Sequence, residues 1–111
     1  MLARANRVTR PVDFRTAVRR GRRVGTNGAV LHVLPSATAD ARRFGFIVSK
    51  SVGNAVTRNL VRRRLRAVSR ELVSVVPAGT DVVMRALPGS ATLPWSTLQS
   101  EITESVGRAV S

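Results

Sequence analysis

The chain has 111 residues, which is the length of one compact domain, and its nineteen basic and six acidic residues give a net charge of +13. A charge excess of this size repels itself unless an anionic partner neutralises it, and nucleic acid is the most common such partner. The absence of cysteine excludes disulfides, thiolate catalysis and cysteine-ligated zinc. No apolar run approaches the roughly 20 residues of a membrane helix, and no signal peptide is recognisable. The composition therefore predicts a cytoplasmic protein that binds nucleic acid, without a membrane or small-molecule partner.

The beginning of the chain predicts a short arm followed by a helix. Residues 1–8 are basic and are expected to form either an arm that orders on RNA or a frayed terminus. In the next segment, TRPVDFRTAVRRG, Pro11 suits the first turn of a helix, Asp13 lies in that turn, and Gly21 is a stop signal. A short helix is therefore expected between them.

Two stretches rich in β-branched and aromatic residues follow. AVLHVL at residues 29–34 and FGFIVS at residues 44–49 predict strands, joined by a polar turn over residues 35–43. The two strands are expected to pair antiparallel with each other. A weaker strand is predicted before them, around residues 23–26.

A long helix is predicted from Asn54, a good N-cap, to about Val75, because Pro77 and Gly79 then close it. Its apolar residues recur at spacings of four, three, four and three, which is the helical period. These residues define the face expected to be buried: Val61, Leu65, Val68, Leu72 and Val75.

The last third of the chain predicts one more strand and one more helix. DVVMRAL at residues 81–87 indicates a buried strand, PGSATL a loop, and Pro94 the first turn of an amphipathic helix. Trp95 lies at helical spacing with Leu98, so it is expected in the core rather than as a platform for bases. The predicted order is helix, three strands, helix, strand, helix, which indicates a single α+β domain over residues 1–111 with helices on one small sheet.

The long helix has a basic side as well as an apolar one. A residue advances about 100° around a helix, so Arg58, Arg62 and Arg66 are expected in a stripe opposite the apolar face, with Arg63 and Arg70 alongside. Like charges at this spacing oppose folding unless a polyanion lies along them. A solvated basic face is the alternative, and arginine codons in a GC-rich genome are an alternative reason for the scarcity of lysine. The density of arginine without interleaved glutamate favours contact with phosphate.

The start of the same helix is a second candidate phosphate contact. Gly53 lets a backbone approach closely, and the free N–H groups after Asn54 carry partial positive charge, with Lys50 nearby. The alternative is an ordinary turn and helix cap without a ligand.

FGFIVSKSVGNAVTRN followed by VRRRLR resembles the signature of the bacterial ribonuclease P protein subunit. DFRTAVRRG resembles the family's first helix, VLHVL its second strand, and DVVMRAL its last strand, so the resemblance covers nearly the whole chain. It implies an α+β domain in which two parallel strands are joined by a left-handed crossover through the arginine helix. It also implies a catalytic RNA that removes the 5′ leader of precursor tRNA, with Mg²⁺ held mainly by that RNA and no catalytic or metal-binding residue in the protein.

The resemblance also implies a set of RNA contacts in this sequence. The signature contacts with the catalytic RNA are Lys50, Gly53, Asn54, Arg58, Asn59, Arg62, Arg63 and Arg66. The leader of precursor tRNA is expected in a cleft between the signature helix and the sheet, beside Phe14, Val18 and His32. Leu60 stands where the family usually has a third signature arginine, and Val18 and His32 stand where it often has aromatic residues. The departure at Leu60 affects one RNA contact, which Arg63 or Arg64 could replace at nearby phosphate. The other two departures weaken stacking and favour a mainly electrostatic grip on the leader.

Two other classes of protein share part of this pattern. A ribosomal or architectural RNA-binding protein would carry the same charge, but it has no reason to combine the Gly-Asn-Ala-Val and Arg-Asn elements with this order of strands and helices. A DNA recognition helix would be expected in a helical bundle, with Asn or Gln beside Arg to read base edges. The ribonuclease P interpretation therefore fits the sequence better than either alternative.

Overall fold

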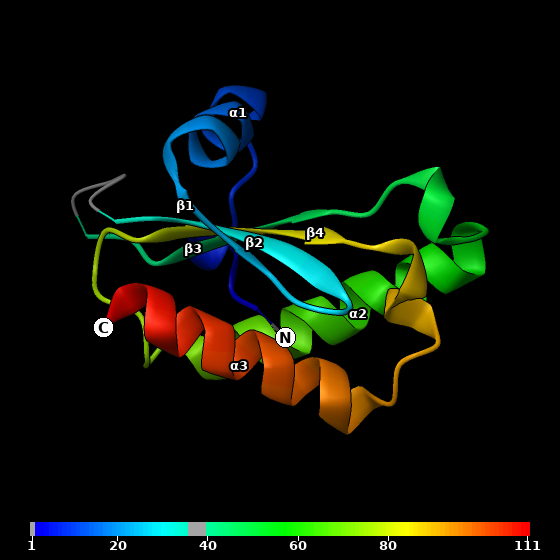
Figure 1. Cartoon of the computed structure of the whole chain (residues 1–111). Helices are drawn as coiled ribbons and strands as arrows, with labels where there is room; N and C mark the ends of the chain where they lie inside the picture. The colour runs from blue at the N-terminus through cyan, green and yellow to red at the C-terminus, as the bar shows by residue number, and fades with distance from the viewer. Residues whose placement is uncertain (1, 36–39) are drawn as a thin grey trace.

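The computed structural model describes residues 2–35 and 40–111, and in this part of the chain three helices cover both faces of a four-stranded sheet (Figure 1). The elements in chain order are η1 (Arg4–Asn6), α1 (Pro11–Arg20), β1 (Arg22–Gly25), β2 (Ala29–Leu34), β3 (Arg43–Ile47), η2 (Lys50–Val52), α2 (Ala55–Leu72), β4 (Asp81–Ala86), η3 (Pro88–Ala91) and α3 (Trp95–Val110). Figure 1 shows α1 on one face of the sheet and α2 and α3 together on the other. The predicted α+β class and order of elements are confirmed.

The order of strands in the sheet differs from the predicted one. The sheet runs β1-β2-β4-β3, with β4 antiparallel to β2 and parallel to β3. The expected antiparallel pairing of β2 with β3 is therefore wrong. The physical reason is burial: β4 is buried at nearly all of its positions, and such a strand belongs inside a sheet rather than at an edge. Of the turn predicted between β2 and β3, residues 36–39 lie outside the described part of the chain.

The parallel neighbours β3 and β4 are joined through α2, as the family resemblance implies. Parallel strands need such a crossover, since a tight turn reverses the chain. The left hand of this connection stays a prediction of the resemblance.

The N-terminal segment is part of the fold, which corrects the prediction of a free or frayed arm. The side chains of Leu2 and Val8 are buried, and the Val8 N–H donates to the Phe44 carbonyl at 2.9 Å. The Arg7 guanidinium donates through Nη2 to the Leu2 carbonyl at 2.7 Å. The segment therefore covers part of the exposed edge of β3, where unpaired backbone groups would otherwise remain.

The apolar face of α2 fills the space under the sheet. Four of its predicted positions are buried: Val61, Leu65, Val68 and Leu72. The prediction for Val75 is wrong, because α2 ends at Leu72 and the side chain of Val75 is 51% exposed. The turn that follows places Val76 in the core instead. On α3, Leu98, Ile102 and Val106 are buried and Trp95 packs against the core, as expected.

Arg43 links α1 to the sheet through two carboxylates. Its guanidinium donates to both oxygens of Asp81, at 2.9 Å from Nε and 2.7 Å from Nη2, and lies 3.3 Å from the Asp13 carboxylate in the first turn of α1. The hydrogen bond to Asp81 is the main cause that raises the pKa of Arg43. Because the Asp81 side chain is only 3% exposed, this paired geometry satisfies a buried charge and fixes α1 over the sheet.

Replacing Leu65 by alanine should lower the free energy of unfolding by about 2 to 5 kcal/mol, since it leaves a cavity between α2 and the sheet. Val56→Ala on the same helix is the matched control, because Val56 is 79% exposed and its loss should change stability by less than about 0.5 kcal/mol. Urea denaturation of both variants gives the comparison. Equal losses would show that α2 does not present the described face to the core.

Candidate nucleic-acid interface

The start of α2 is fixed by a glycine and an asparagine. Gly53 has a φ of 155°, and a Cβ at this position would lie 2.8 Å from the Thr57 side chain, so only glycine fits without strain. The Asn54 side chain accepts a hydrogen bond from the Thr57 N–H at 2.9 Å and caps the helix. Lys50 is exposed one short turn earlier, in η2. The predicted cap is confirmed, and the signature lysine lies beside the positive end of the helix.

One side of α2 forms a row of polar and basic side chains, exposed except for the half-buried Arg62, which we call the α2 basic face. Its members are Asn59, Arg62, Arg63, Arg66 and Arg70. Arg62 is the most restrained, because it donates to Asn59 Oδ1 at 3.1 Å and its Nη2 lies 3.5 Å from the Val48 carbonyl. The carboxylate of Glu71 accepts hydrogen bonds from Gln99 on α3. Glu71 shares a hollow with Arg63, Arg66 and Arg70, but among the described residues both ion pairs belong to Arg43, so no carboxylate forms an ion pair with this face.

Arg58 lies at the margin of this face rather than within it. The sequence pattern predicts Arg58 opposite the apolar residues, but the side chain is half-buried. Its Nε is buried and has no hydrogen-bond partner among the described residues, and the same holds for Nη1 of Arg64. Leu60, which occupies the third signature position, is also half-buried. The exposed basic surface is therefore centred nearer to Arg63 and Arg66 than the sequence predicts.

A cavity of about 250 Å³, which we call the edge cavity, opens beside β3 at the edge of the sheet. It brings together residues from the N-terminal segment, α1, β3 and α2: Arg7, Val8, Thr9, Phe14, Phe44, Phe46, Arg62 and Arg66. Gly45 makes room for one wall, since a Cβ there would lie 2.6 Å from the Phe14 ring. Aromatic rings and guanidinium groups therefore line the same small space, which suits a flat, negatively charged ligand.

The edge cavity lies between the signature helix and the edge strand β3 of the sheet. That such a cleft holds the leader stays a prediction. The space between α2 and the face of the sheet is filled by the hydrophobic core. Phe14 and Val18 instead come from α1, on the opposite face, and only Phe14 reaches the arginines of α2, around the edge of β3. Val18 is 41% exposed and His32 is buried, and neither lines the edge cavity.

His32 lies inside the sheet face that α1 covers. The register aligns it with Val83 and Gly45, and its side chain is only 4% exposed, so it is a buried rather than a half-exposed residue of the strand. Both ring nitrogens are without a hydrogen-bond partner among the described residues. Burial first, and then the charges of Arg85 and Arg23, lower the pKa of His32. The ring is therefore neutral near pH 7 and cannot attract phosphate by charge.

Three residues of this region were not predicted from the sequence. Arg7 and Phe46 line the edge cavity, and Arg85 is exposed on the same strand as the buried Val83. The sequence held a signal for Phe46, because it lies two residues after Phe44 on a strand and so shares a face with it. It also held a signal for Arg85, which is the single exposed position of β4. Nothing in the sequence indicates that Arg7 folds back onto β3.

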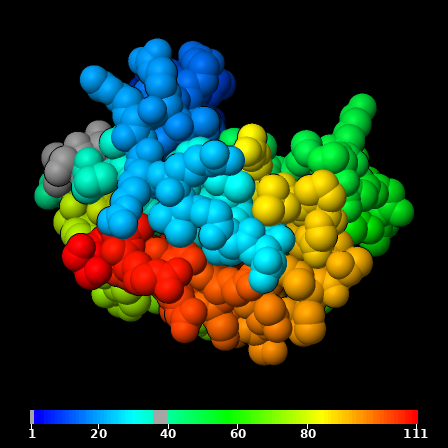
Figure 2. Space-filling model, viewed as in Figure 1, coloured from blue at the N-terminus to red at the C-terminus, as the bar shows by residue number. Residues whose placement is uncertain are grey.

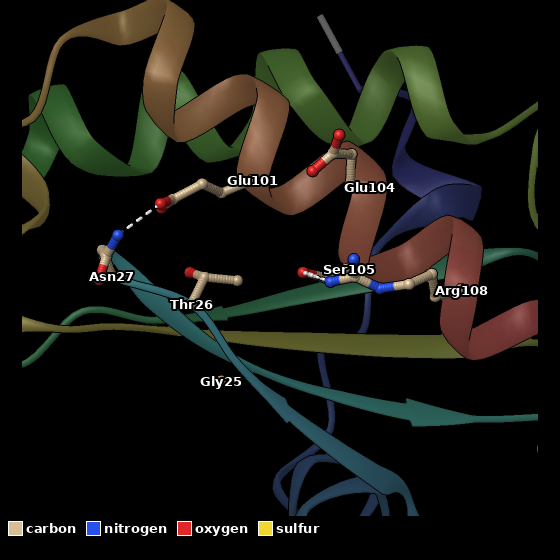
Figure 3. Close-up of a pocket in the computed structure, with 7 residues that line it drawn as sticks. All are labelled: Gly25, Thr26, Asn27, Glu101, Glu104, Ser105 and Arg108. Carbon is tan, nitrogen blue, oxygen red and sulfur yellow. Dashed lines mark hydrogen bonds between the residues drawn. The ribbon is translucent and has the colours of Figure 1, made fainter.

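A different hollow contains two acidic residues of α3. It lies between the turn from β1 to β2 and α3 (Figure 3) and is lined by Gly25, Thr26, Asn27, Glu101, Glu104, Ser105 and Arg108. The Asn27 amide donates to Glu101 Oε2 at 2.7 Å across it. Carboxylates repel phosphate, so we exclude this hollow from the nucleic-acid interface.

Comparison with known proteins identifies the family. A family model described as Ribonuclease P matches residues 2–110. The chain belongs to the ribonuclease P protein family. The ribonuclease P protein component of Clavibacter michiganensis is 57% identical, over 99% of this chain and 97% of the relative. That of Rhodococcus jostii is 48% identical, over 92% of this chain and 86% of the relative.

Solved structures of the family share the fold. An RNase P protein of Staphylococcus aureus, described as a mutant with defective mRNA degradation activity, has a TM-score of 0.85 and 26% identity, covering 95% of this chain and 88% of its own. The RNase P protein of Thermotoga maritima, at 22% identity, has a TM-score of 0.79 and covers 92% of this chain and 96% of its own. The second likeness concerns the fold alone.

Family membership settles the class of function. This chain is a protein component of ribonuclease P, an endoribonuclease complex that processes tRNA, and it has an RNA partner. Membership favours this function over the ribosomal and DNA-binding alternatives. Within residues 2–35 and 40–111, no helix is long and apolar enough to cross a membrane. The same residues hold no group of three or more His, Asp or Glu side chains that could bind a metal ion.

The buried neutral His32 should make stability depend on pH. Below its ordinary pKa of 6.5 the unfolded chain binds a proton that the folded chain does not, so the free energy of unfolding should fall as the pH drops from 6.5 toward the lower folded pKa. Thermal melts between about pH 7 and pH 5 should show this loss, and His32→Phe should reduce it.

Arg85→Gln tests how far a neighbouring positive charge lowers the pKa of His32, since it removes that charge but keeps the imidazole. It should raise the folded pKa of His32 and so also weaken the pH dependence. An unchanged pH profile in His32→Phe would show that His32 is not the responsible group.

Proposed function

We propose that the α2 basic face binds the catalytic RNA of ribonuclease P and that the edge cavity holds part of the 5′ leader of precursor tRNA. The observation that carries this proposal is the continuity between the two: Arg62 and Arg66 belong to the α2 basic face and also line the cavity that contains Phe14 and Phe46. One helix can therefore contact the catalytic RNA on its outer side and the substrate at its margin.

The α2 basic face is suited to an RNA backbone. Its arginines recur at the helical period, are exposed or half-buried, and have no carboxylate partner among the described residues. Guanidinium groups bind phosphate in a planar, bidentate geometry and stay charged at any physiological pH. Lys50, Gly53, Asn54 and Arg58 extend this surface toward the start of the helix, and we retain them as proposed contacts together with Asn59 and Arg63.

The edge cavity is suited to a single strand. It is smaller than the roughly 300 to 1,000 Å³ of a drug-sized pocket, so it would take one base rather than a folded segment. Stacking of a base on Phe14 or Phe46 tolerates any sequence, and Arg62 or Arg66 would meet the adjoining phosphate. We therefore replace the predicted Val18 and His32 contacts by Phe46 and Arg7, with Arg85 as a further contact on the same face as His32.

The chain itself would assist rather than catalyse the cut. Asp13 and Asp81 are committed to Arg43, and Glu71 and Glu101 to amide side chains. These carboxylates do not fit a metal site, so we derive no step through a metal held by this chain. In the proposed complex the RNA holds Mg²⁺ and supplies the activated water, and the location would be the cytoplasm, where precursor tRNA is processed.

Adding the full chain to its cognate catalytic RNA at low Mg²⁺ should stimulate removal of the leader, because the protein neutralises phosphates that Mg²⁺ otherwise screens. Gel analysis of end-labelled precursor tRNA measures the rate. Stimulation should be larger for a substrate with a long leader than for one with a single leader nucleotide. Cleavage by the protein alone, or no increase in the rate of cleavage by the RNA, would contradict this proposal.

Binding to the catalytic RNA should weaken with salt at a log-log slope of about −3.5 to −4.5 if about five arginines of α2 meet phosphates. The variant Arg63→Gln/Arg66→Gln should reduce the magnitude of this slope by about 2, one for each lost contact. Arg4→Gln/Arg108→Gln removes the same charge from exposed positions outside the α2 basic face and should change it much less. A wild-type slope near zero would mean that the α2 basic face is only solvated.

A further inference from the structure

A second concentration of arginine lies on α1 and β1, outside the proposed interface. We call it the α1 basic face, and its members are Arg15, Arg19, Arg20 and Arg23, all of them exposed. Arg23 is aligned with His32 and so lies on the side of the sheet that α1 covers, whereas the neighbouring Arg22 faces the other side. The single acidic residue of α1 is Asp13, and its carboxylate is paired with Arg43 of the sheet. Among the described residues no carboxylate forms an ion pair with an arginine of this face.

A purely structural explanation for these arginines is that they stabilise the end of α1. Arg19 and Arg20 lie in its last turn, where positive charge interacts favourably with the helix dipole. This explanation covers two of the four arginines. Arg15 lies in the middle of the helix, one turn before Arg19, where the pair of like charges opposes helix formation. Arg23 lies on the edge strand β1, outside the helix, so the helix dipole does not account for it.

The two basic faces are separate surfaces. Figure 1 shows α1 on one side of the sheet and α2 on the other. The molecule extends 26 Å along each of its two shorter axes, so charges on opposite sides of it are largely screened from one another at 0.1 M salt, where the Debye length is about 10 Å. A polyanion bound to the α2 basic face therefore leaves the repulsion within the α1 basic face largely in place. This surface needs an anionic partner of its own.

The shape and composition of the α1 basic face indicate which kind of RNA fits. Figure 2 shows α1 raised above the rest of the surface, so this face is convex. Its exposed apolar side chains include Val12 and Val18, whereas Phe14 is turned toward Gly45. A single strand needs aromatic platforms for its unstacked bases, while an A-form duplex presents two phosphate rows and a wide minor groove to a convex basic surface.

We infer that the α1 basic face is a second RNA-binding surface, which docks on the backbone of a double-stranded segment of the catalytic RNA. This inference rests on the proposed function for the identity of the RNA. We assign the resident RNA rather than the substrate because the repulsion among these arginines is permanent, whereas precursor tRNA leaves after each turnover. The protein would then lie between two segments of one RNA and hold them at a fixed separation.

The variant Arg15→Gln/Arg19→Gln tests this inference in the full chain, with Arg4→Gln/Arg108→Gln as the control of equal charge. Affinity for the catalytic RNA is measured against salt, and hydroxyl-radical footprinting locates the protected nucleotides. We expect the α1 variant to lower the magnitude of the salt slope by about 2 and to lose protection in one duplex segment. Protection that depends on Arg63 and Arg66 should persist. Thermal melts establish that the variant is folded.

The outcomes separate the inference from the proposed function. If the wild-type chain binds the catalytic RNA and the α1 variant has the same slope as the control, only the inference is overturned. Lost protection confined to single-stranded nucleotides, or a loss seen only in the affinity of the holoenzyme for precursor tRNA, would also overturn it. If the wild-type chain does not bind the catalytic RNA, the proposed function fails and the inference fails with it.

Discussion

The burial of one side of α2 against the centre of the sheet is the contact on which the rest of the structure depends. Val61, Leu65 and Val68 occupy the space under β4, and this orientation decides which residues of the helix remain outside. The arginines of the opposite side are exposed because the core holds the helix in place against their mutual repulsion. A helix with the same arginines and a weaker apolar face would lower this repulsion by unfolding, whereas here only an anionic partner can do so.

The edge of β3 has a role that the order of elements alone does not indicate. Because β4 occupies the centre of the sheet, β3 becomes an edge strand, and α1 and α2 lie on its two sides. The N-terminal segment closes part of this edge and leaves the edge cavity beside it. A residue from each face of the sheet can thus contribute to one ligand site, which a fully paired central strand would prevent.

The sequence predicted local structure well and long-range pairing poorly, for a physical reason. Helical periodicity and cap residues such as Asn54 act over one or two turns, so the start of α2 and its buried residues could be predicted. The insertion of β4 between β2 and β3 depends on the total burial of the sheet, which no local pattern contains. The position of Phe14 beside Arg62 follows from that insertion, and so does the burial of His32. The half-burial of Arg58 depends on how α2 is rotated on the sheet, which its spacing alone leaves open.

The contact between Gly45 and Phe14 limits which residue can occupy position 45. The Phe14 ring lies directly on the backbone of β3, so the width of the edge cavity is set by the thickness of a single residue. A methyl group at position 45 would lie 2.6 Å from the Phe14 ring, so the ring would have to shift and the edge cavity would change shape. The proposed site for the leader would then change without the loss of any charged group. The small size of an uncharged residue can in this way matter to the site as much as the charge of an arginine.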